Sequence, residues 1–170
     1  MNKIFISAVI GLSVLSGCST IRTHSSLDQD TNKKLSTLNG GVMLKINKKR
    51  DLANAFGNAD IYGGKVNAGY VELRYRGMNK DGQIILSLFD NSVSSTETTM
   101  TRYKPLMPQN DNSINVNINA IPNESSVMQG NAFVHNYKEE PTLTIENYTI
   151  EIIKASSSQI EYQIRENKEK

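Results

Sequence analysis

The sequence predicts an all-β fold, an antiparallel β-sandwich with a small β-barrel as the alternative, after a flexible N-terminal tether. Short segments of alternating apolar and polar residues recur along the chain, and Gly, Pro, Asn and Ser separate them. No long segment carries the 3.6-residue period of an amphipathic helix. At 170 residues the chain suits a single domain that buries its own core. No repeat of fixed length is visible, which argues against a solenoid or propeller.

An apolar segment near the start of the chain leads to its only cysteine, Cys18. Lys3 precedes a mostly apolar run, residues 4–15. The run is too short to cross a hydrocarbon core of about 30 Å and has the length of a signal-peptide core. It ends in the order Leu-Ser-Gly-Cys, residues 15–18, with small side chains just before the cysteine. This order resembles the lipobox of bacterial lipoproteins.

The resemblance implies a signal peptide over residues 1–17 that is cleaved before Cys18. The Cys18 thiol would carry a diacylglyceryl group, and the new amine an acyl chain such as palmitate. Two or three acyl chains anchor a protein firmly, since each buried methylene contributes about 0.8 kcal/mol. Ser19 stands where lipoproteins retained in the inner membrane of enteric bacteria carry Asp, so the resemblance implies the outer membrane. A secreted protein with a chance cysteine at its cleavage site is the alternative.

Residues 18–39 are expected to form the lipidated cysteine and a disordered tether. Polar residues dominate this segment and no period holds across it, so it offers little apolar surface to offset the entropy of ordering. Asp28 begins a segment that resembles a calcium loop, but Lys33 replaces the required Gly and Asn39 the required Glu. His24 has no second ligand nearby in the sequence and is interpreted as solvated.

A single β-rich domain is predicted over residues 40–166, followed by a charged tail over residues 167–170. Alternation over residues 42–47 predicts its first strand. The basic run that follows, residues 48–50, either meets an anionic surface such as lipid phosphates or is a solvated strand end. A short helical turn is expected over residues 51–57, with Asp as its cap and Gly as its stop.

The segment 57–69 is irregular and contains four glycines. A long irregular loop in a compact domain is more often functional than not, although glycines in β proteins also make bends and bulges. If the domain binds a ligand here, Phe56, Tyr62 and Tyr70 are the candidate contact residues. The segment lacks the spacing of a phosphate-binding glycine motif.

The clearest pattern in the chain is a β-hairpin over residues 70–89, with Asp81 and Gly82 in its turn. The remaining alternating segments predict strands over residues 97–103, 114–120, 131–137, 143–145, 148–152 and 160–164. A loop is expected over residues 123–130. The alternation changes phase at residues 146–147, which predicts a bulge or a tight turn.

Few residues suggest catalysis or metal binding. His135 is the one histidine of the predicted domain, without further ligands at metal spacing or a G-x-S-x-G serine. Basic and acidic residues nearly balance, which argues against a nucleic-acid partner. The sequence predicts a non-enzymatic binding or envelope-assembly module with no cofactor and no metal. Its partners would be the membrane, through acyl chains on Cys18, and an envelope protein or glycan. An envelope enzyme such as a hydrolase with a site near His135 is the alternative.

Overall fold

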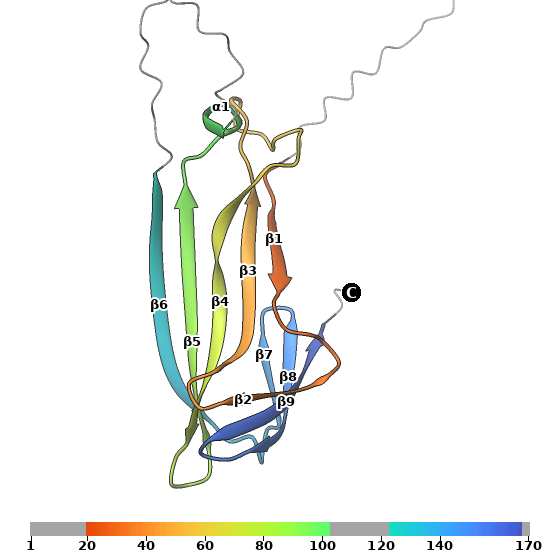
Figure 1. Cartoon of the computed structure of the whole chain (residues 1–170), viewed down its shortest axis with the longest axis vertical. Helices are drawn as coiled ribbons and strands as arrows, with labels where there is room; N and C mark the ends of the chain where they lie inside the picture. Colours follow the sequence, from red (N-terminus) through yellow and green to blue (C-terminus); the bar gives the residue numbers. More distant parts are fainter. Residues whose placement is uncertain (1–19, 103–122, 168–170) are drawn as a thin grey trace, which may run out of the picture.

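The computed structural model describes residues 20–102 and 123–167, and their strands form two antiparallel sheets (Figure 1). The first sheet has the order β1-β3-β4-β5-β6, with bounds Thr23–Leu27, Val42–Asp51, Lys65–Met78, Ile84–Ser95 and Glu124–His135. The second has the order β2-β9-β8-β7, with bounds Lys34–Leu38, Gln159–Glu166, Tyr148–Ala155 and Thr142–Ile145. A one-turn helix, α1 (Thr99–Arg102), follows β5.

The two sheets pack face to face around one hydrophobic core, which confirms the predicted sandwich. Neither sheet closes on itself or on the other, so the barrel alternative is wrong. Nearly all of the fully buried side chains in this core come from alternating positions of both sheets, as expected for a sandwich interior. The largest of them are Met43, Leu44, Ile46, Leu73, Tyr75, Ile84, Leu86, Ile150, Ile160 and Ile164.

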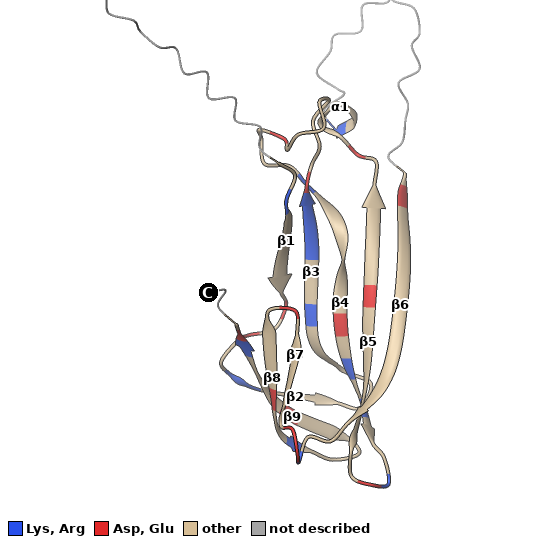
Figure 2. Cartoon of the chain, turned by 180° about the vertical axis from the view of Figure 1, so that it is seen from behind, with Lys and Arg blue, Asp and Glu red and all other residues tan. Residues whose placement is uncertain are grey.

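The five-stranded sheet is longer than the four-stranded sheet, which covers its lower part in both Figure 1 and Figure 2. Side chains of β6 are exposed over nearly the whole length of the strand. Strand β6 has a partner, β5, on one side only within the described residues. At its upper end the long sheet continues into connecting segments, and the second sheet does not reach this end (Figure 1).

The predicted tether is wrong for residues 23–38, which contain two paired strands. Strand β1 pairs with β3 and strand β2 pairs with β9. Leu27 and Leu35 each pack against the main core, and backbone pairing supplies the rest of the stabilisation. One apolar contact per strand is too weak a signal to distinguish these strands from a linker. Cys18 lies outside the described residues.

His24 also differs from its interpretation as a solvated residue without a partner. Its Nε2 atom lies 2.6 Å from Oδ1 of Asp51, at the far end of strand β3. The other carboxylate oxygen of Asp51 accepts the N–H of Arg22 at 3.0 Å. These contacts lower the pKa of Asp51, first through the Arg22 backbone N–H and then through His24. In the sequence, His24 and Arg22 lie 27 and 29 positions before Asp51, a separation that no local pattern indicates.

Three further expectations from the sequence are wrong. The helical turn expected over residues 51–57 is absent, because Ala53 forms isolated bridges to Ala59 and Thr98. The strand expected from residue 97 is replaced by α1. The loop expected over residues 123–130 belongs to β6, which pairs with β5 along its full length. The strand expected over residues 114–120 lies outside the described residues.

The predicted β-hairpin over residues 70–89 and the last predicted strand are confirmed, and the phase change at residues 146–147 is a tight turn. In the β4–β5 turn, Oδ1 of Asn79 accepts the N–H groups of Asp81 and Gln83 at 3.0 and 2.9 Å. In the β7–β8 turn, Glu146 adopts a φ of 49°, and this turn accounts for the phase change in the alternation. Strand β9 contains the predicted segment 160–164. The basic run forms residues 48–50 of β3, which ends at Asp51.

Candidate functional site

One end of the sandwich consists of two connecting segments, residues 52–64 between β3 and β4 and residues 96–102 after β5. We call these segments the loop cap; they lie at the top of Figure 1. Leu52, Ala59 and Val66 are buried at this end, away from the main core. The loop cap is therefore a packed substructure with its own apolar centre.

Backbone hydrogen bonds close the first segment of the loop cap on itself. The N–H of Leu52 donates to the carbonyl oxygen of Gly64, and the N–H of Asp60 donates to the carbonyl oxygen of Leu52, each at 2.8 Å. The buried carboxylate of Asp60 accepts the N–H of Gly64 at 3.0 Å. The Asp60 carboxylate therefore has its hydrogen-bond donor within the same loop.

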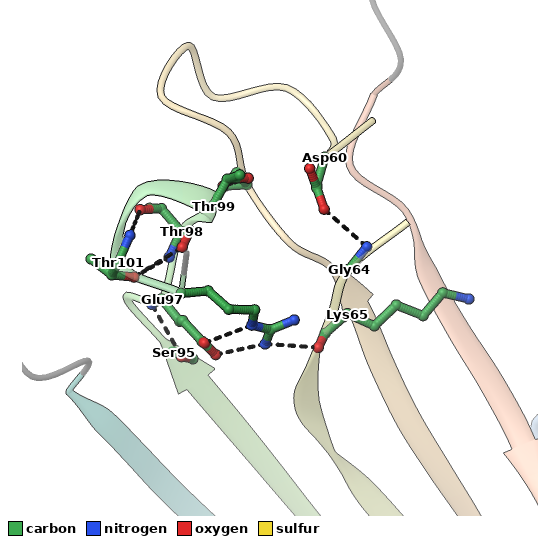
Figure 3. A network of polar contacts seen from close by, with 10 residues as sticks. Asp60, Gly64, Lys65, Ser95, Glu97, Thr98, Thr99 and Thr101 are labelled. Atoms are coloured by element: carbon green, nitrogen blue, oxygen red, sulfur yellow. Dashed lines mark hydrogen bonds and ion pairs between the residues drawn. The ribbon is translucent and has the colours of Figure 1, made fainter. Parts of the chain in front are cut away.

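A polar network joins the two segments (Figure 3). Arg102 donates to both carboxylate oxygens of Glu97, at 2.7 and 2.8 Å, and to the carbonyl oxygen of Lys65 at 3.1 Å. The N–H and hydroxyl of Thr99 both donate to the carbonyl oxygen of Ala53, at 2.9 and 3.2 Å. The hydrogen bond from Arg102 is the main cause of a lowered pKa at Glu97. The network holds the segments in a fixed arrangement.

We expect Arg102→Gln to raise the pKa of Glu97 toward its ordinary value and to destabilise the loop cap by about 1 kcal/mol. Because the pKa of Glu97 is lowered in the folded chain, the pair stabilises the cap above the ordinary pKa of Glu. This stabilisation disappears as the pH falls through the lowered pKa. NMR titration of the Glu side-chain carboxyls measures the change, and the exposed Lys80→Gln provides a control. An unchanged Glu97 pKa in Arg102→Gln would contradict the assignment.

Apolar side chains project from the loop cap into solvent. Phe56 is 89% exposed, Ile61 84%, Tyr62 75% and Met100 59%. The four side chains line one shallow cleft of about 210 Å³. Isolated exposed apolar residues are common, whereas a group on adjoining loops is typical of a contact surface. We call these four side chains the apolar tip.

A polar groove lies beside the loop cap, over strands β1, β3 and β4. It has a volume of about 580 Å³ and is lined by Ser26, Asp28, Asn47, Lys48, Lys49, Gly63, Lys65, Val66 and Asn67. Within the described residues, Lys49 and Lys65 are exposed and form no ion pair. Figure 3 shows the Lys65 side chain pointing away from the Arg102 network, and Figure 2 shows the basic stretch of β3 close to the loop cap.

The structure brings two of the three candidate contact residues together. Phe56 and Tyr62 line the same cleft of the loop cap. Tyr70 lies farther along β4, where the Nζ atom of Lys45 is 5.0 Å from the centre of its ring. His135 lies at the opposite end of the sandwich, opposite the first residue of β5. Its Nε2 atom is 2.8 Å from the backbone oxygen of Glu140, and in the described part of the chain no serine or carboxylate side chain bonds to it.

Sequence reasoning missed most of the groove and half of the apolar tip. Ile61 and Met100 belong to separate loops that only the folded network brings together. Ser26 lies in the segment taken for a tether. The basic run gave a partial signal, because Lys48 and Lys49 both line the groove but differ in their ion pairing. Lys48 forms an ion pair with Glu146 of the second sheet at 2.7 Å, whereas Lys49 is exposed in the groove.

Comparisons with protein-family models, curated proteins and solved structures find no match to this chain. Among residues 20–102 and 123–167, no three His, Cys, Asp or Glu side chains are grouped in a way that would hold a metal ion. The helix in these ranges lacks the length and apolar character needed to span a bilayer.

Proposed function

We propose that the protein is a lipoprotein of the cell envelope, anchored in the outer membrane by acyl chains on Cys18, and that it acts as a non-enzymatic binding module. Its binding surface is the polar groove, and its ligand is an anionic saccharide of the envelope. The observation that carries this proposal is the exposure of Lys49 of β3 and Lys65 of β4 in a groove whose other charged residues, Asp28 and Lys48, already have side-chain partners in Asn47 and Glu146.

The groove combines positive charge with neutral hydrogen-bonding groups. Lys49 and Lys65 supply ammonium groups that attract a carboxylate or phosphate. Asn67 uses its side-chain oxygen to accept the N–H of Gly69 at 3.0 Å, which leaves its amide N–H groups for a ligand hydroxyl. Ser26 of β1 adds a hydroxyl to the lining. An open groove of this kind suits a segment of a polymer better than a small molecule enclosed on all sides.

The acidic groups near the groove support binding and not catalysis. Asp28 accepts a hydrogen bond from the side chain of Asn47. Asp51 is shared between His24 and the backbone of Arg22, so it ties the start of β1 to the end of β3. Each carboxylate has a structural partner, and no hydroxyl nucleophile bonds to His24 within the described residues.

Co-sedimentation with purified peptidoglycan sacculi, which carry carboxylates, and binding to lipopolysaccharide, which carries phosphates, test the groove. We expect Lys49→Glu with Lys65→Glu to weaken binding to the preferred polymer about tenfold or more, a loss of about 1.4 kcal/mol. Binding of the unmodified protein should weaken as salt is added, because both lysines are exposed.

The matched control reverses two exposed charges at the other end of the sandwich, Lys80→Glu with Lys138→Glu. Gly82 of the β4–β5 turn lies beside Lys138, which places both control residues far from the groove. Equal losses in the two double variants would indicate a general charge effect. Absence of binding to either polymer would contradict the saccharide ligand.

A further inference from the structure

We infer that the apolar tip inserts into the interface of the membrane that holds the acyl chains of Cys18, so that the domain stands end-on on that membrane. This inference rests on the proposed lipid anchor, and it assigns a second membrane contact to the loop cap.

The chain between Cys18 and the first strand is short. Strand β1 begins at Thr23, five positions after Cys18, and five extended residues span at most about 18 Å. Thr23 pairs with Arg50, one residue before the end of β3. The backbone of Arg22 is tied to Asp51 by two hydrogen bonds, at 3.0 and 2.9 Å.

The start of β1 and the loop cap therefore lie at the same end of the sandwich. Residue 52, the first of the loop cap, follows Asp51 directly. In Figures 1 and 2 the start of β1 and helix α1 are both at the top. Lipid on Cys18 would bring this end, and not the β4–β5 turn at the opposite end, close to the bilayer.

The residue types of the apolar tip suit a bilayer interface. Phe56, Ile61 and Met100 present apolar side chains, and Tyr62 combines an aromatic ring with a polar hydroxyl. Aromatic side chains of this kind are enriched where hydrocarbon meets headgroups. Ile21, between Cys18 and β1, is also partly exposed and adds apolar surface near this end. The packed loop cap already fixes the tip, so insertion requires little further ordering.

The charge around the apolar tip is compatible with anionic headgroups. Asp60 and Glu97 are the acidic residues of the loop cap. The carboxylate of Asp60 is buried against the Gly64 N–H, and Glu97 is neutralised by Arg102. Lys65 follows the first loop segment and is exposed. A surface with internally paired acids and an exposed cation is attracted to an anionic leaflet.

Single-tryptophan fluorescence tests the insertion cleanly, because the chain contains no tryptophan. Phe56→Trp places the probe at the apolar tip, and Val134→Trp places it on an exposed site near the opposite end. Each lipidated, full-length mature variant is reconstituted into vesicles of phosphatidylethanolamine and phosphatidylglycerol, with or without brominated lipid. Circular dichroism confirms that both variants keep the β-fold.

We expect the emission of Phe56→Trp to shift to shorter wavelength and to be quenched by brominated lipid, while Val134→Trp remains unshifted and unquenched. Vesicle-bound protein in which Phe56→Trp stays water-exposed would overturn the insertion and leave the lipid anchor intact. Quenching of both probes would overturn the end-on orientation. Protein that fails to sediment with vesicles would contradict the anchor itself, and the inference would fall with it.

Discussion

Replacing Cys18 with alanine is expected to transfer the protein from the membrane fraction to the soluble fraction. The thiol is the attachment point that the lipobox resemblance implies, and two or three acyl chains would supply nearly all of the membrane affinity. The apolar tip consists of four side chains and cannot replace that contribution. Cell fractionation with immunoblotting measures the change, and labelling with a radioactive fatty acid reports the loss of lipid.

Ser19→Asp provides a matched control next to the same cysteine. It leaves the thiol in place, so the variant should still incorporate lipid and remain in the membrane fraction. By the resemblance to enteric lipoproteins, it is expected to move from the outer to the inner membrane. Unchanged membrane fractionation of Cys18→Ala would contradict the anchor, and unchanged lipid labelling would contradict the assignment of Cys18.

Strands with one buried and one exposed face could be predicted from the sequence alone. Residues 71–75 of β4 and 148–152 of β8 alternate because each strand packs one face against the core. Strand β1 gave no such signal, and β6 gave one only from residue 131 onward. Strand β6 contributes Phe133 to the core and is otherwise mostly exposed, so its pairing with β5 defines it as a strand. A strand held mainly by a distant partner leaves little trace in local composition.

Only the part of the candidate site that lies in one segment of the chain could be predicted from the sequence. The glycine-rich loop pointed to Phe56 and Tyr62, because large aromatic residues there belonged to no alternating strand. Met100 joins them through the hydrogen bonds from Thr99 to the carbonyl oxygen of Ala53, in a segment expected to be a strand. The groove likewise combines residues from three strands, one of which was expected to be disordered.

Gly69→Ala is expected to lower the free energy of unfolding by about 3–5 kcal/mol, measured by urea denaturation followed by circular dichroism. Gly69 has a φ of 108° and lies where the β3–β4 register shifts. A Cβ atom at this position would come within 1.8 Å of the carbonyl oxygen of Asn91 in β5. Relief of this collision requires β4 and β5 to separate locally, and their pairing is central to the first sheet.

Gly63→Ala is the control that distinguishes the cost of this collision from the cost of backbone strain. Gly63 also has a positive φ, 71°, but a Cβ atom there would meet no atom within 4 Å. Only the left-handed backbone conformation opposes alanine at this position, so the expected loss is about 1 kcal/mol. Equal losses in the two variants would show that backbone strain sets the cost at Gly69. A neutral Gly69→Ala would mean that the β4–β5 pair opens readily beside the polar groove, which a rigid binding surface would not allow.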